Sequence, residues 1–203
     1  MGNELDAALS DPVAAVALLL HRDSNRVAVM VDKIVVQGGH PDIGRALVAA
    51  IEANPRPALY AVMELARRKF DFSGTDAIAA IRPHLQAQSR AAFALLRLGV
   101  VEPAVIKRIE ETLEDFDELS TTMSSLRLSV EAGVDPRPLA HIAIAALARD
   151  PGSGGAARTI GVFAEAGADM SAAVPELERR TAGDEDDDDY DHDAASALEA
   201  IRG

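Results

Sequence analysis

A helix-ending glycine recurs every 34 residues in the second half of the chain. Gly133 lies in the pentapeptide Glu-Ala-Gly-Val-Asp and Gly167 in the nearly identical Glu-Ala-Gly-Ala-Asp, while Gly99 precedes Gly133 by the same interval. Glycine is favoured just past a helix C-terminus, where a left-handed backbone is needed, and Asp or Pro favours the next helix start. Gly39 and Gly74 extend these marks at less regular steps. The repeat predicts helix pairs that stack, because a single pair cannot bury its own apolar face.

Apolar residues between these marks recur at helical spacing, and no sustained alternation typical of strands is present. One predicted face consists of Leu59, Val62, Met63, Ala66 and Phe70, and another of Ile106, Ile109, Leu113 and Phe116. The valine-rich segment Val27–Val36 also fits a helical face and is assigned to a helix. Ser10-Asp11-Pro12 is typical of a capped helix start. The breakers leave twelve predicted helices of roughly 10–16 residues.

We therefore predict an all-α fold, a right-handed αα-superhelix of about six helix pairs in a single domain spanning residues 1–203. Ala, Leu, Val and Ile dominate the 48% of hydrophobic residues, while aromatic residues make up only 3%, which suits closely packed helices. An acidic loop at 183–190 falls within the last pair. The predicted pairs span 5–38, 40–73, 75–99, 101–133, 135–167 and 169–202.

Two segments resemble known repeat families. The alanine-rich stretch 191–201 is similar to the second helix of a HEAT repeat, and the chain as a whole resembles bacterial HEAT-like superhelical proteins. Residues 138–143 and 163–170 resemble the two helix signatures of an ankyrin repeat, although the 133–138 segment is too short for an ankyrin hairpin loop. The resemblance implies a binding scaffold and carries no residue-level function.

Charge and composition exclude several classes of function. The net charge of −13 disfavours binding to nucleic acid, since phosphate backbones are repelled, and favours a basic partner. The chain has no cysteine, so disulfides and thiolate metal sites are excluded. We find neither a membrane-length apolar run nor a signal-peptide pattern, and we expect a cytoplasmic protein that does not bind membranes.

An acidic run occupies residues 184–193 and carries eight of the 33 acidic residues. Three interpretations stay open: a solvated loop whose acids favour the last helix N-terminus, a docking patch for a basic partner, and a cation site. A regular calcium loop is not indicated, because no glycine supplies the sharp turn. The candidate partner-binding residues in the run are Asp184, Glu185, Asp186, Asp187, Asp188, Asp189 and Asp191.

A second acidic cluster spans the end of one predicted helix and the start of the next. Acids at a helix C-terminus oppose the helix dipole, which hints at a function, while a charged outer face is the simpler interpretation. If both clusters face the same way, they form an acidic surface suited to a basic protein. The candidate residues here are Glu110, Glu111, Glu114, Asp115, Asp117 and Glu118.

No pattern predicts catalysis, a cofactor or a metal. The five histidines form no pair at helical metal-binding spacing, and no serine lies in a nucleophile-elbow pattern. Gly152-Ser153-Gly154-Gly155 has the composition of a phosphate loop without its Lys-Ser/Thr ending. We therefore predict a non-catalytic protein-interaction module. Two alternatives remain: an immunity-type inhibitor of a toxin or nuclease, and a HEAT-like enzyme or lyase.

Overall fold

The computed structural model describes residues 10–21, 24–36, 41–182 and 191–203. These residues form twelve α-helices and three short 3₁₀ segments, and no strand occurs among them. The all-helical prediction is confirmed, including the assignment of the valine-rich segment, which lies within α3. Gly39 and most of the acidic run lie outside the described residues.

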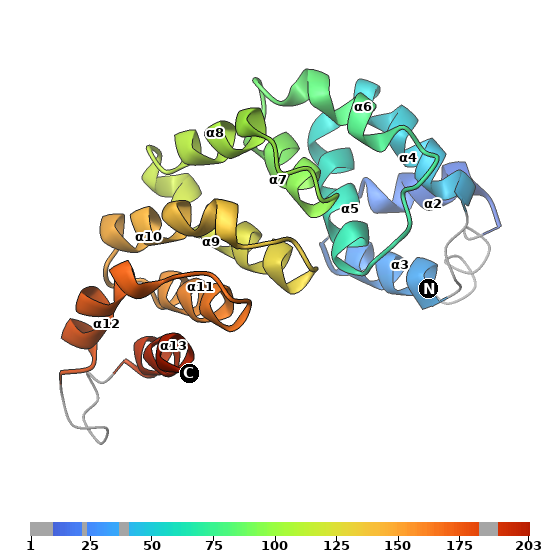
Figure 1. Cartoon of the computed structure of the whole chain (residues 1–203). Coiled ribbons are helices and arrows are strands. Elements are labelled where there is room, and N and C mark those ends of the chain that lie inside the picture. The colour runs from blue at the N-terminus through green and yellow to red at the C-terminus, as the bar shows by residue number, and fades with distance from the viewer. Residues whose placement is uncertain (1–9, 22–23, 37–40, 183–190) are drawn as a thin grey trace. The chain divides into compact units, whose positions relative to one another are not determined.

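The chain divides into two compact units, residues 1–100 and 101–203. In the first unit, α4 packs against α2, α5 and α6, while α5 also packs against α3 and α7 (Figure 1). The first helices of successive pairs, α2, α4 and α6, therefore form one row within this unit. The second helices, α3, α5 and α7, form the adjoining row. The elements are α2 (Pro12–Leu19), α3 (Ser24–Val36), α4 (Pro41–Ala53), α5 (Pro55–Arg67), α6 (Ala77–Ile81), η1 (Arg82–His84) and α7 (Ser89–Arg97).

In the second unit α11 is the central helix, packed against α9, α10 and α13 (Figure 1). Gly161 lets α11 and α13 approach closely, since a Cβ there would lie only 3.4 Å from the Cα of Ala197. The elements are α8 (Pro103–Thr112), α9 (Phe116–Glu131), η2 (Arg137–Leu139), α10 (Ala140–Arg149), α11 (Gly154–Glu165), η3 (Ser171–Ala173), α12 (Val174–Arg180) and α13 (His192–Arg202).

Each unit has its own apolar core, to which the predicted face with Leu59 contributes in the first unit. Leu47, Leu59 and Phe93 are at most 1% exposed in the first unit. Leu126 and Phe163 are fully buried in the second unit. Burying such side chains stabilises each unit by about 2 kcal/mol per residue. A single superhelix running through both units stays a prediction.

The three glycines that are spaced 34 residues apart end helices as predicted. Gly99, Gly133 and Gly167 have φ values of +82°, +104° and +85°. At each site the same two hydrogen bonds close the helix: the Gly99 N–H donates to the carbonyl of Leu96, and the Val100 N–H donates to that of Leu95. This is the Schellman arrangement, in which glycine avoids the strain that a Cβ brings.

Two expectations on helix ends and lengths are wrong. Gly74 does not end a helix, because α5 already ends at Arg67 and Lys69, with φ +61°, takes the position that glycine holds elsewhere. Several helices are also shorter than expected, and α6 has only 5 residues. Pro83 follows it within η1, and its missing N–H cannot continue an α-helix.

Candidate functional site

The second acidic cluster forms the corner between α8 and α9, which we call the acidic corner (residues 110–118). Glu110 and Glu111 lie in the last turn of α8. Asp115 is the N-cap of α9, where its Oδ1 accepts a hydrogen bond of 3.0 Å from the Asp117 N–H. Asp117 and Glu118 lie in the first turn of α9, where acids favour the helix dipole. The structure therefore brings all six predicted residues to one turn between two helices.

A buried pair of threonines pins this corner from the inside. The hydroxyl oxygens of Thr112 on α8 and Thr122 on α9 lie 2.7 Å apart. One hydroxyl donates to the other, and the accepting one donates to its own helix: Oγ1 of Thr112 lies 2.6 Å from the Ile109 carbonyl, and Oγ1 of Thr122 lies 3.0 Å from the Glu118 carbonyl. Both side chains are buried, so water does not compete for these contacts. The acidic residues consequently stand on a fixed turn.

Helix α10 supports the corner from one side. The Nε2 of His141 lies 2.7 Å from Oε1 of Glu110, and the Arg149 Nη2 donates to the backbone carbonyl of Glu114 at 3.4 Å. Glu111 accepts from Arg108, one turn earlier on α8, at 3.3 Å. These contacts engage the carboxylates of Glu110 and Glu111 at the α8 end, and the charge of Arg108 partly offsets that of Glu111.

The carboxylates at the tip of the corner have no such partners. Glu114 and Asp117 are exposed, and no described residue forms an ion pair or hydrogen bond with their carboxylates. Exposed acids next to each other repel, a cost that a cationic partner would remove. The unneutralised negative charge of the corner therefore concentrates at the turn and the start of α9.

Phe116 projects from the same turn and is 66% exposed. The prediction that it belongs to a buried face with Ile109 and Leu113 is wrong for Phe116, because the helix breaks at 113–115 and the periodicity does not continue across the break. Of the aromatic residues that the structure describes, it is the most exposed; Phe93 and Phe163 are almost fully buried. An exposed aromatic ring between two aspartates is a feature that helical packing does not require.

The first acidic run is only partly described. Asp184, Glu185, Asp186, Asp187, Asp188 and Asp189 lie outside the described residues. Asp191 is engaged inside its own unit: Oδ1 caps α13 by accepting from the Ala194 N–H at 2.9 Å, and Oδ2 accepts from Nε of Arg180 at 2.9 Å. Burial alone would raise the pKa of Asp191, but these bonds hold it below its ordinary value. Its contacts therefore serve the helix start, and binding of a partner by this residue stays a prediction.

Three further expectations from the sequence concern the glycine-rich loop at residues 152–155, a metal site and a membrane-spanning helix. Ser153 of the glycine-rich loop is the N-cap of α11, and its Oγ accepts from the Ala156 N–H at 3.3 Å. The described residues contain no group of three or more His, Asp or Glu side chains that could hold a metal ion. Within the same residues, no helix combines the length and apolar character needed to span a membrane.

Comparison with known proteins does not assign the chain to a family. No family model matches it, and neither a curated protein nor a solved structure shows significant similarity to it. The HEAT-like resemblance thus stays an expectation, and any function has to be argued from the residues themselves.

Proposed function

We propose that the chain is a non-catalytic protein-interaction module whose acidic corner binds a basic protein partner. The observation that carries this proposal is the exposed ring of Phe116 beside the unpaired carboxylates of Glu114 and Asp117. The fitting partner segment presents an apolar pocket or side chain with Lys or Arg residues around it.

The chemistry of protein interfaces supports this partner. Aromatic residues that become buried at the centre of an interface commonly account for more than about 2 kcal/mol of binding energy, while surrounding charges set orientation and association rate. The threonine pair holds the turn in place before binding, so little conformational entropy is lost on association. The net charge of −13 adds long-range attraction for a basic protein.

An immunity-type inhibitor of a basic toxin or nuclease is a narrower form of the same proposal and would use the same corner. No observation on the described residues favours a HEAT-like enzyme or lyase over an interaction module. We therefore carry only the interaction module to experiment.

The test is affinity capture from native-source lysate with the purified chain, in low salt and at about 0.5 M salt, where charge attraction is screened. The wild type is compared with Phe116→Ser and with the double variant Glu114→Gln/Asp117→Asn. The matched control is Glu165→Gln/Glu199→Gln, which removes two exposed acids elsewhere in the same unit.

We expect one basic protein to bind the wild type and the control, to be lost with Phe116→Ser, and to be weakened by the double variant and by salt. Equal capture by all four proteins would place the binding surface elsewhere. Capture that survives high salt and the double variant but not Phe116→Ser would contradict the basic nature of the partner.

A further inference from the structure

The connection between α5 and α6 is long for this chain. It covers residues 68–76, whereas the connections 98–102, 132–136 and 166–170 have five residues each. Insertions in repeat arrays fall in loops on one face, and that face is often the binding face. The additional residues border a hollow of about 690 Å³, a volume in the range of small-molecule sites.

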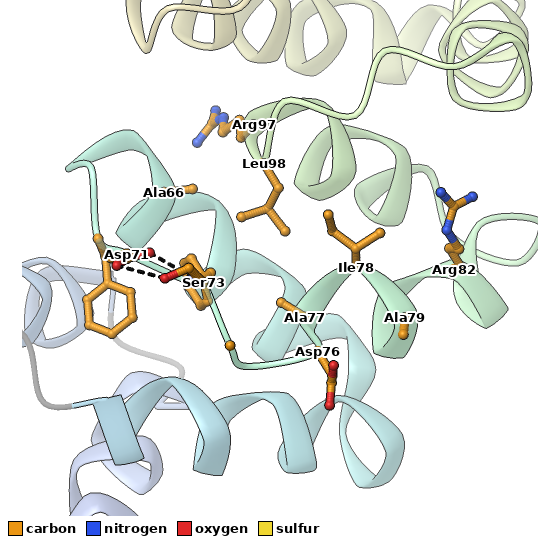
Figure 2. A pocket seen from close by; sticks show the side chains of 13 residues that line it. Ala66, Asp71, Ser73, Asp76, Ala77, Ile78, Ala79, Arg82, Arg97 and Leu98 are labelled. Atoms are coloured by element: carbon orange, nitrogen blue, oxygen red, sulfur yellow. Dashed lines mark hydrogen bonds between the residues drawn. The ribbon is translucent and has the colours of Figure 1, made fainter.

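The wall of this hollow is largely apolar. Leu98 at the end of α7 and Ile78 of α6 project into the space between their helices (Figure 2). Phe70 and Phe72 border the hollow from the long connection, and their ring centroids lie 4.9 Å apart in an edge-to-face arrangement. The face of an aromatic ring attracts a cation, because the electron density of the ring is concentrated there. The wall therefore suits a hydrocarbon group that carries a positive charge.

Two carboxylates at the hollow lack a cationic partner. Asp71 and Asp76 line it and are exposed, and no residue in the described ranges forms an ion pair with either. Asp71 accepts only from neutral groups: Oδ1 from the Ser73 N–H at 2.7 Å, and Oδ2 from the Ser73 hydroxyl at 2.9 Å (Figure 2). These bonds hold the pKa of Asp71 below its ordinary value. Both oxygens of this ionised carboxylate can accept a further hydrogen bond.

The arginines that line the hollow are engaged within the chain. Arg82 has an interaction partner already. The side chain of Arg97 is only 2% exposed, and its Nη1 donates to the Met63 carbonyl at 3.0 Å. Glu64, 3.7 Å from the same nitrogen, partly offsets its charge. The unneutralised charge that a ligand can reach is therefore that of the two carboxylates.

Contacts within the unit hold the long connection in place before a ligand binds. The Phe72 carbonyl accepts a hydrogen bond of 2.6 Å from the buried Thr75 hydroxyl. Phe70 packs closely on α4 at Gly44, where an added Cβ would lie 3.2 Å from the ring. Because these groups are already ordered, binding at the hollow loses little conformational entropy.

We propose that this hollow binds a small organic cation, a primary ammonium with an apolar body. The ammonium donates to the Asp71 carboxylate beside the two phenylalanine rings, and Asp76 adds attraction from the same connection. The apolar body packs against Leu98 and Ile78. The site lies entirely within the first unit and is independent of the acidic corner.

The experiment is a titration of the ¹⁵N-labelled full chain with 4-phenylbutylamine at neutral pH and about 0.15 M salt, which screens unspecific charge attraction. Binding is measured from ¹H–¹⁵N correlation spectra. Three further probes divide the ligand chemistry: 4-phenylbutan-1-ol lacks the charge, 4-phenylbutyrate reverses it, and methylammonium lacks the apolar body. We expect saturable shifts of the Gly74, Ile78 and Leu98 amides with the amine, and at least about fivefold weaker binding of the other probes.

The double variant Asp71→Asn/Asp76→Asn tests the carboxylates and keeps the fold. An amide oxygen at position 71 can still accept from Ser73, and Asn tolerates the φ of +56° at position 76. It is expected to weaken amine binding by at least about fivefold. The control Asp11→Asn/Glu52→Gln removes two exposed acids of the same unit that do not line the hollow, and it should leave binding within about twofold.

Ile78→Lys tests the wall by placing a positive charge at a position that is 38% exposed. It is expected to weaken amine binding by at least about tenfold, whereas Val13→Lys, at a 72% exposed position of the same unit, should leave binding within about twofold.

The absence of saturable shifts at these amides up to about 10 mM amine would overturn the site. Equal binding of the alcohol or of 4-phenylbutyrate would overturn the preference for a cation, and equal binding of methylammonium would overturn the role of the apolar wall. Unchanged binding by the Asp71→Asn/Asp76→Asn variant would contradict the role of the carboxylates, and unchanged binding by Ile78→Lys would place the ligand elsewhere.

Discussion

Among the described residues, Arg97 in the first unit and Arg180 in the second are arginines with almost fully buried side chains near the end of a helix, and the two differ in how completely they are paired. Arg180 on α12 is 6% exposed, and all three of its side-chain nitrogens have partners: Asp191 accepts from two, and the Ser153 carbonyl accepts from the third at 3.2 Å. Arg97 on α7 has a carbonyl, a distant carboxylate and an unpartnered Nε. The paired arginine joins three segments of its unit, whereas the other keeps a buried donor without an acceptor.

The same contrast appears in the backbone. At the described helix ends outside the connection between α5 and α6, the residue with a positive φ is a glycine, as at Gly133 and Gly167. The connection 68–76 instead has non-glycine residues at positive φ near both ends, Lys69 at +61° and Asp76 at +56°. Strained residues of this kind cost about 1–3 kcal/mol each and gather at functional sites. The region from α5 to α7 therefore carries unsatisfied features that the region from α11 to α13 lacks.

The largest effect is expected when the well-paired arginine loses its partner. Asp191→Asn removes the charge opposite Arg180 and leaves a buried cation uncompensated, which should lower the free energy of unfolding by about 3 kcal/mol. Urea unfolding at neutral pH measures it. Asp193→Asn, two residues away at a 38% exposed carboxylate, is the control and should cost less than about 1 kcal/mol. Equal losses in both variants would show that the Arg180 pair does not hold the unit together.

The same pair predicts an acid dependence of stability. Because the pKa of Asp191 is held below its ordinary value in the folded chain, its contribution is present above the unfolded pKa of about 4 and is lost as the pH falls through the folded value. Between about pH 5 and pH 2 the wild type should therefore lose more stability than Asp191→Asn does. Parallel pH profiles for the two proteins, measured by urea unfolding, would contradict the role of this carboxylate.

Arg97→Met should have a smaller effect, a change of about 1 kcal/mol or less in the free energy of unfolding. The side chain that is removed has an unmet donor, and Glu64 keeps Arg67 as its nearer partner. Arg180→Met, the matched variant in the other unit, should cost more, because it strips Asp191 of its cation. If Arg97→Met proves as costly as Arg180→Met, then Arg97 is a structural residue and the contrast between the two arginines fails.

The sequence predicts local features of the fold better than the sites. The helix ends at Gly99, Gly133 and Gly167 were predictable because positive φ is a local demand that glycine alone meets without strain. The helix end at Lys69 was not predictable, since no glycine stands at the position with positive φ. Helical periodicity likewise found the buried faces but misassigned Phe116, where the helix breaks.

The sites depend on contacts between distant residues, and this limits what a sequence can show. The acidic corner was identifiable because its six acids all lie within residues 110–118, but the 2.7 Å contact between Glu110 and His141 joins residues 31 apart. The hollow beside the connection 68–76 combines residues of α5, α6 and α7. Its one signal in the sequence was the irregular spacing between the glycines at 74 and 99.

The smallest predicted effect tests the contrast between glycine and non-glycine residues at positive φ, which differ there in the presence of a Cβ atom. Lys69 and Gly133 occupy the same position past a helix end, with Lys69 N–H donating to the Ala66 carbonyl and Gly133 N–H to that of Val130. Lys69→Gly should raise the free energy of unfolding by about 0.5 kcal/mol, because relief of the left-handed strain exceeds the added entropy of the unfolded chain. Gly133→Ala should lower it by about 1 kcal/mol through strain alone, since a Cβ there meets no atom within 4 Å. A loss of stability in Lys69→Gly would mean that the lysine side chain itself stabilises the end of α5. The connection 68–76 would then not be strained at this residue.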